Sequence, residues 1–226
     1  MPEFTLSKMI ETVTDPTNLI VIIYMLIVTV FWLSARALQK PEVIKQRAVF
    51  LSPNHTIWLQ NKFRSKYMDI FTSYIWFLVF IFAIFSLYFF CLFQGKNMWK
   101  IGFPAVLALN SALFVQLIYP VVVPVRYPDF NKELEGFEII RLNLSKSSDT
   151  FNGFLYNGFP SNHLGLVITA IWLCWVSNSL DPWIGWEVII IVFIIVAIIF
   201  SFSVLYLGEH YLYDLLGACL IYGIML

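Results

Sequence analysis

Two residues near the end of the chain have the types and the spacing of a catalytic pair. His210 and Asp214 lie four positions apart in GEHYLYD, so on a helix they share a face and sit one turn from each other. An aspartate there can accept from one imidazole nitrogen and leave the other nitrogen free as a nucleophile. The pair therefore predicts an oriented histidine nucleophile. The alternative is that both are merely polar residues at a membrane interface.

A second polar stretch, FPSNH, opens an apolar run at residues 159–163. Proline is favoured in the first turn of a helix, and serine is favoured at the cap, so one interpretation is simply a well-formed helix start. The free amides of such a start also form an anion site, to which Ser161 and Asn162 would belong. His163 would then project from the first turn, where it could protonate a leaving oxygen.

Arg126 follows the third apolar run and supplies a cation. Arginine at the end of an apolar helix is often only an interface anchor, but its planar fork also suits bidentate contact with phosphate. Phosphoryl transfer needs positive charge on the equatorial oxygens, an in-line nucleophile and an acid for the leaving group. The residues above furnish those parts, and no metal or other cofactor is required.

The elements that must position these residues are apolar helices. The chain has 226 residues, of which 60% are hydrophobic and 12% charged, and its mean hydropathy is +0.79. Its net charge of zero gives no indication of nucleic acid as a partner. Several runs are long enough to cross a hydrocarbon core. We expect an all-α, polytopic membrane protein, a single domain over 1–226, with spans at 18–35, 70–94, 101–123, 164–180, 183–207 and 211–226.

Six alternating spans bring the polar residues to one membrane face. The segment between spans one and two, the linker between three and four, and the turn between five and six all lie on that face. The candidate residues belong to these places, and they are Arg126, Ser161, His163, His210 and Asp214. We therefore expect one composite active site at one face of the membrane, with a catalytic core at about residues 101–226.

The motifs resemble those of the type-2 phosphatidic acid phosphatase superfamily. PSNH at residues 160–163 matches its Pro-Ser-x-His motif, and Ser203, His210 and Asp214 match the spacing of its third motif. The resemblance covers residues 101–226 and implies a six-helix core that cleaves lipid phosphates. It implies that His210 forms a phosphohistidine, that Asp214 orients it and that His163 protonates the leaving alcohol. Ser161 and Arg126 would hold the phosphate.

Two expected cations are replaced. Tyr119 stands where the family's first motif has lysine, and Val204 stands where the third has arginine. The surrounding sequence is more similar to the branch that contains inositol phosphorylceramide and sphingomyelin synthases. A phosphodiester carries less negative charge than a phosphomonoester, so a diester donor would need fewer cations. Alternatively, a cation in the linker substitutes, with Arg141 as one candidate. Tyr119, Ser203 and Arg141 are therefore accessory candidates.

Three functions remain open from the sequence. The first is a lipid phosphatase, the second is a phosphotransferase that moves a headgroup to an alcohol acceptor, and the third is a lipid-binding protein without catalysis. A transporter is disfavoured because few polar residues lie within spans, Asn110, Ser111 and Gln116 among them. The expected partners are the lipid bilayer and a lipid phosphate of the diacylglycerol, polyisoprenyl or sphingolipid type.

The side of the membrane on which the site lies is also open. Most lysines and arginines fall in the segments on the site face, and the positive-inside rule places such segments in the cytoplasm. The resembling family mostly faces the lumen or the periplasm instead.

Overall fold

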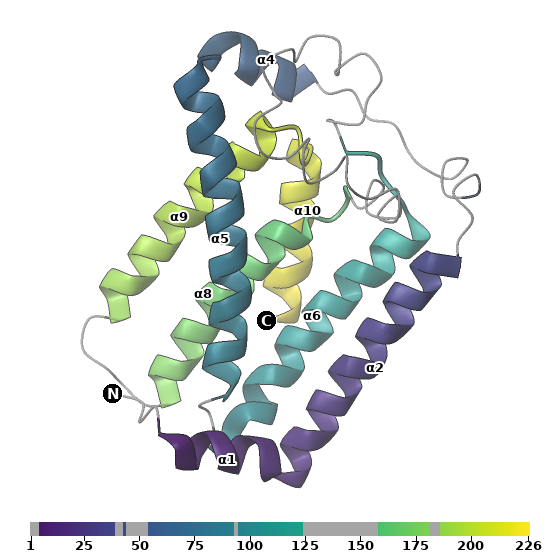
Figure 1. Ribbon diagram of the computed structural model, residues 1–226, viewed down its shortest axis with the longest axis vertical. Helices are drawn as coiled ribbons and strands as arrows, with labels where there is room; N and C mark the ends of the chain where they lie inside the picture. Colours follow the sequence, from purple (N-terminus) through teal and green to yellow (C-terminus); the bar gives the residue numbers. More distant parts are fainter. Residues whose placement is uncertain (1–4, 39–42, 44–53, 93–94, 124–157, 181–185) are drawn as a thin grey trace.

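The computed structural model of this chain describes residues 5–38, 43, 54–92, 95–123, 158–180 and 186–226. Within these residues the secondary structure is helical, which confirms the expected all-α class. The helices are α1 (Leu6–Thr14), α2 (Pro16–Leu38), α4 (Asn54–Phe63), α5 (Lys66–Leu92), the short 3-10 helix η1 (Gly95–Asn97), α6 (Met98–Ile118), α8 (Asn162–Leu180), α9 (Trp186–Tyr206) and α10 (Leu212–Met225). Figure 1 shows them as a bundle, with α4 across one end and α1 across the other.

Each predicted span corresponds to one long helix, namely α2, α5, α6, α8, α9 and α10 in chain order. The third span ends earlier than predicted, at Ile118 instead of residue 123. Tyr119 leaves the helical region, with φ −125° and ψ 73°, because the ring of Pro120 disfavours helical backbone in the residue before it. Helices α1 and α4 were not predicted as separate elements.

Helix α1 is joined to α2 and η1 by hydrogen bonds from the side chain of Asn18. Asp15 caps α2, because its carboxylate accepts from the amides of Thr17 and Asn18 at 2.9 and 3.1 Å, while Pro16 takes the first helical position. The buried amide of Asn18 donates to the carbonyls of Thr12 and Gly95 at 3.1 and 2.8 Å. These bonds hold α1, α2 and η1 together at the end of the bundle opposite α4.

Helix α8 lies at the centre of the bundle, where it packs against α5, α6, α9 and α10. Small residues on α6, Ala108 and Ala112, are fully buried and let the neighbouring backbones approach closely. Tyr222 of α10 is also fully buried, and its ring lies where a side chain on Gly165 of α8 would be. The core is therefore continuous from α5 to α10.

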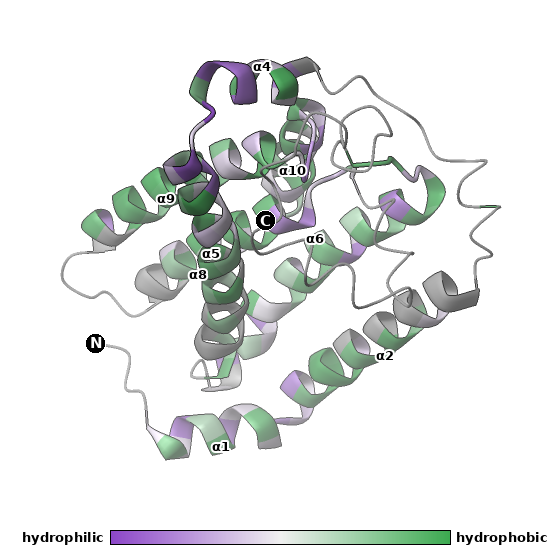
Figure 2. Ribbon diagram, turned by 45° about the horizontal axis from the view of Figure 1, so that its top comes forward, coloured by the Kyte–Doolittle hydropathy of each residue, from purple (hydrophilic) through white to green (hydrophobic). Residues whose placement is uncertain are grey.

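The outer surface of the bundle is apolar. Large hydrophobic side chains are exposed on several helices, and Ile20, Phe85, Ile198 and Leu220 are each at least 64% exposed. Figure 2 shows hydrophobic colour along α2 and α9 and hydrophilic colour concentrated at α4. Apolar surface of this extent is typical of a protein that contacts a membrane.

Two of the described helices are long and apolar enough to cross a membrane by length and composition, with spanning segments at Lys66–Ala83 and Met98–Ile118. Shorter apolar stretches lie at Asn162–Val176, Ile190–Tyr206 and Leu212–Met225. These helices suggest membrane association, and the six-span topology stays a prediction.

Candidate active site

The start of α8 carries Ser161 and His163. Ser161 is the N-cap: its hydroxyl oxygen accepts from the amide of Leu164 at 3.2 Å, as a capping serine does. Its own amide donates to the carbonyl of Asp214 at 3.0 Å, so the cap is bonded to the first turn of α10. The hydroxyl is fully buried and keeps its hydrogen for a further acceptor, such as a phosphate oxygen.

The turn between α9 and α10 carries His210. Gly208 has a φ of 71°, which only glycine adopts without strain, and it ends α9. The amide of Gly208 donates to the carbonyl of Leu205 at 3.1 Å, and the amide of Glu209 donates to the carbonyl of Val204 at 2.9 Å. This pair of bonds is the Schellman motif, and it reverses the chain so that His210 points into the bundle.

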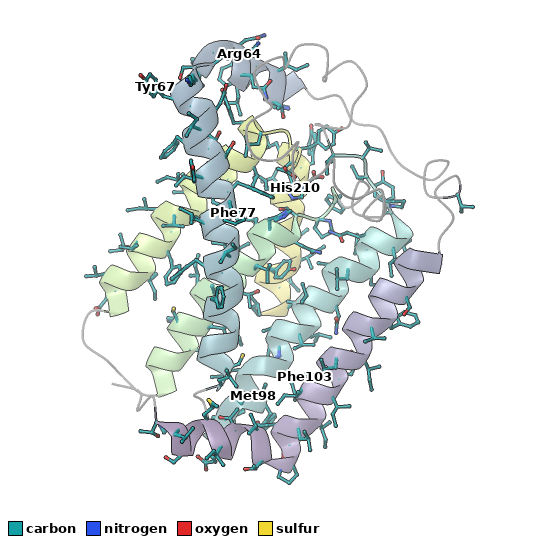
Figure 3. All side chains as sticks on the ribbon, in the orientation of Figure 1. Arg64, Tyr67, Phe77, Met98, Phe103 and His210 are labelled. Atoms are coloured by element: carbon teal, nitrogen blue, oxygen red, sulfur yellow. The ribbon has the colours of Figure 1, made fainter. Side chains whose placement is uncertain are left out.

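The two histidines predicted from the sequence are in direct contact. The Nδ1 of His163 lies 2.9 Å from the Nε2 of His210, and their rings meet edge to face. Trp76 of α5 packs beside the ring of His163, with 5.9 Å between centroids. His210 is 2% exposed, so this contact is inside the bundle. In Figure 3, His210 lies near the level of Phe77 and below Arg64 and Tyr67, so the site is recessed from the end that carries α4.

Asp214 lies behind His210, as the spacing predicts. Its Oδ2 atom is 3.4 Å from the Nδ1 of His210 and accepts from the amide of Tyr211 at 2.7 Å. The carboxylate is fully buried, and its Oδ1 atom has no hydrogen-bond partner among the residues that the structure describes. Its negative charge is therefore held beside the imidazole, where it stabilises a cationic ring.

These contacts fix the tautomer of His210. Its Nδ1 atom lies 3.0 Å from the carbonyl oxygen of Gly158, which can only accept, so Nδ1 carries the proton. The Nε2 atom of His210 is then the acceptor, and the Nδ1 of His163 is the donor between the rings. The lone pair of His210 Nε2 therefore faces the proton on His163 Nδ1, and the two side chains are hydrogen-bonded to each other.

The side chain of Asn162 is directed away from the two histidines. Its amide donates to the Oε1 of Gln116 at 3.2 Å, and its oxygen accepts from the hydroxyl of Tyr222 at 3.4 Å. The sequence assigned Asn162 to phosphate binding. Its phosphate-binding role stays a prediction, and its backbone amide lies in the first turn of α8.

The accessory candidates are placed differently. Tyr119 lies at the end of α6, is half-exposed, and packs edge to face on Phe159 just before the α8 cap. The hydroxyl of Ser203 donates to the carbonyl of Ile199 in its own helix at 2.9 Å. Arg126 and Arg141 lie outside the described residues, so their phosphate-binding roles stay predictions.

The bundle also has a large apolar cavity, whose lining includes none of the candidate site residues. It has a volume of about 830 Å³ between α5 and α9 and is lined by hydrophobic side chains, Leu78, Phe82 and Val192 among them. The described side chains of that lining are all hydrophobic and offer no group that could hold an anion. Among the described residues, no three His, Cys, Asp or Glu side chains gather where they could hold a metal ion.

Sequence reasoning missed three partners of the site: the Gly158 carbonyl, the Trp76 ring and the Gln116 carboxamide. A backbone carbonyl leaves no trace in a sequence, and one tryptophan among many aromatic residues is not distinctive. Gln116 did leave a signal, because a carboxamide within an apolar span is rare.

A family model described as PAP2 superfamily matches residues 46–226, which is most of the chain. The match includes every helix that carries a residue of the site. Comparison with curated proteins gave no match, and comparison with solved structures gave none either.

Proposed function

We propose, from the premise that this chain belongs to the PAP2 superfamily, that it is a multi-pass membrane phosphatase acting on lipid phosphates through a phosphohistidine at His210. Membership in the superfamily fits phosphatase or phosphotransferase activity. The observation that supports catalysis through a phosphohistidine is the close arrangement of His163, His210 and Asp214. The two histidine nitrogens lie 2.9 Å apart, and His210 Nδ1 lies 3.4 Å from the Asp214 carboxylate.

In the first half-reaction, the Nε2 lone pair of His210 attacks the phosphorus atom of the lipid phosphate. The N–P bond forms while the ester P–O bond breaks, and the leaving alkoxide takes the proton of His163. The His210 ring, protonated at Nδ1 and phosphorylated at Nε2, is cationic. Asp214 stabilises that charge, and the Ser161 hydroxyl with the α8 amides holds the phosphate oxygens.

Substrate must enter between the two rings. A separation of 2.9 Å leaves no room for a phosphoryl group between His163 Nδ1 and His210 Nε2. The imidazole of His163, which is half-buried, therefore turns away from His210 when substrate binds. The hydrogen bond of His210 to the Gly158 carbonyl and its ion-pair contact with Asp214 keep the nucleophile in place.

In the second half-reaction, water attacks phosphohistidine at phosphorus, and His163 removes its proton. The N–P bond breaks, inorganic phosphate leaves, and both histidines return to their starting states. An alcohol acceptor in place of water would give phosphate transfer by the same steps. The replacement of two expected cations by Tyr119 and Val204 favours that alternative, with a phosphodiester donor.

The substrate class follows from the surroundings of the site. A recessed phosphate site within a bundle whose outer faces are apolar suits an amphiphile that keeps its tails in lipid. Diacylglycerol phosphates, polyisoprenyl phosphates and sphingolipid headgroups all have that form.

The test is the release of inorganic phosphate by the purified protein in detergent, with a panel of these lipid phosphates. We expect His210→Ala to lower the turnover by about 10³-fold or more, because the nucleophile is lost. Ser111→Ala is the matched control, since Ser111 is outside the candidate site and its hydroxyl bonds to its own helix in the described contacts. Brief incubation should also leave an acid-labile, base-stable phosphoenzyme on the wild type and none on His210→Ala.

Each outcome has a distinct meaning. Equal release by wild type and His210→Ala would refute catalysis through this site. Absence of release from every monoester by folded protein would refute the phosphatase proposal, and headgroup transfer from phosphodiester donors to alcohols would be measured next.

A further inference from the structure

Gln116 is a polar residue that the proposed reaction does not use. It lies in the last turn of α6, a mostly apolar helix, and is fully buried. Burying a carboxamide is unfavourable unless its donor and acceptor groups are hydrogen-bonded. A buried glutamine at this place therefore indicates that its hydrogen bonds serve a purpose.

The carboxamide of Gln116 contacts the chain on both sides of Ser161. Its Nε2 atom donates to the carbonyl of Pro160 at 2.8 Å, and its Oε1 atom accepts from the side-chain amide of Asn162 at 3.2 Å. Ser161 lies between these two residues and caps α8. A single side chain from α6 thus holds the residue before the cap and the residue after it.

The network continues to α10, which carries the other half of the site. The Tyr222 hydroxyl donates to the Oδ1 of Asn162 at 3.4 Å, and the amide of Ser161 donates to the carbonyl of Asp214 at 3.0 Å. The cap of α8 is therefore bonded to α6 on one side and to α10 on the other. His163, one residue beyond Asn162, takes its position relative to His210 from this clamped turn.

We propose that Gln116 is a positioning residue, which holds the Pro160–Asn162 turn so that Ser161 and His163 face the phosphate bound at His210. The inference rests on the proposed function, because the positions it explains are those of the phosphate-binding and proton-donating groups. Gln116 itself does not touch the reacting atoms. Its loss should lower turnover more than it weakens substrate binding, because a small displacement of a catalytic group is costly.

Ser111 provides a matched control within the same helix. Its hydroxyl donates to the carbonyl of Leu107 at 2.8 Å, so it is a polar side chain of α6 whose bond stays inside the helix. Replacing Gln116 by methionine keeps a long unbranched side chain and removes both hydrogen bonds. Replacing it by glutamate keeps the shape and makes the bonding depend on protonation.

For Gln116→Met we expect kcat to fall about 10- to 100-fold with KM changed less than threefold, whereas Ser111→Ala keeps the wild-type values. In Gln116→Glu, the neutral acid can donate its O–H to the Pro160 carbonyl and accept from Asn162, but the carboxylate cannot donate. The ratio of Gln116→Glu activity to wild-type activity should therefore rise as the pH falls, while the ratio for Gln116→Met stays flat. That pH-dependent rescue would show that hydrogen bonding by residue 116, and not its side-chain volume, sustains turnover.

A second measurement does not depend on turnover. In ¹⁵N-histidine-labelled protein, the nitrogen resonances of His163 and His210 should shift in Gln116→Met and stay unchanged in Ser111→Ala. If wild type releases phosphate and Gln116→Met has the same kcat, the positioning role is refuted while the phosphatase stands. If wild type has no activity, the proposed function fails, and unchanged histidine resonances in Gln116→Met would refute the positioning role as well.

Discussion

The Nδ1 of His163 lies 2.9 Å from the Nε2 of His210, and the Gly158 carbonyl that accepts from His210 Nδ1 makes His163 the donor between the two rings. We therefore predict that His163→Ala lowers turnover of a lipid phosphate by about 10²- to 10⁴-fold, because the leaving alkoxide is no longer protonated. An aryl phosphate, whose leaving group needs no proton, should lose much less activity in the same variant. The measurement is kcat for both substrates, and equal losses would mean that His163 is not the acid.

We propose that Asp214 stabilises positive charge on the His210 ring. An isosteric substitution can distinguish this role from a purely structural one. In Asp214→Asn, the amide oxygen can still accept from the Tyr211 amide, but the charge that stabilises the His210 ring is lost. We expect turnover to fall by about 10²- to 10⁴-fold with an unchanged thermal midpoint. The steady-state fraction of phosphoenzyme, measured by rapid quenching, should also fall. A variant with wild-type turnover would show that the carboxylate is only a helix cap.

Helix α10 positions Asp214 through close packing, and its glycines provide an internal comparison. A Cβ on Gly217 would lie 2.3 Å from the Cε2 of Phe159, whereas a Cβ on Gly223 would meet nothing within 4 Å. We predict that Gly217→Ala destabilises the protein by about 1–3 kcal/mol, because the Phe159 ring must move. Gly223→Ala should be neutral or stabilise by about 0.5–1 kcal/mol, because alanine favours helix. Thermal unfolding in detergent compares the two, and equal midpoints would contradict the packing.

The helices and the central residues of the site could be predicted from the sequence, since apolar runs specify helices and the i, i+4 spacing places Asp214 beside His210. The hydrogen bonds between distant elements could not. The bond of Gln60 to the carbonyl of Tyr206, at 2.7 Å, joins α4 to the end of α9 across 146 positions of the chain. Gln116 and Pro160 are likewise 44 positions apart. Such pairs depend on tertiary packing, which local pattern does not encode.

At the scale of the whole molecule, the two ends of the bundle are built differently. The α4 end is polar (Figure 2). There, Gln60 of α4 donates a hydrogen bond to the carbonyl of Tyr206 in α9, and the Tyr206 hydroxyl donates one to Asp69 of α5. The opposite end is closed by the Asn18 network of α1, α2 and η1. His210 lies nearer the α4 end than the α1 end (Figures 1 and 3). If the bundle spans the bilayer and hydrolyses lipid phosphate as proposed, we expect the product phosphate to leave on the side where α4 lies.

That orientation predicts opposite accessibility for the two ends of α5. Ser65 directly precedes α5 and Asn97 follows it in η1, and both side chains are exposed. We expect single cysteines at these positions, in a chain whose Cys91, Cys174 and Cys219 are replaced by alanine, to react with a membrane-impermeant maleimide from opposite sides of sealed vesicles. Permeabilised vesicles are the control, in which both positions should react.

Labelling of both cysteines from the same side would mean that α5 does not cross the membrane, and the six-span topology would fail with it. Labelling from opposite sides, with Ser65→Cys reached from the cytoplasm, would place the phosphate-releasing face there, as the positive-inside rule predicts. The reverse result would place it on the lumenal or periplasmic side. Because Ser65 belongs to the α4 end, this one experiment determines both whether α5 spans the bilayer and which compartment receives the product.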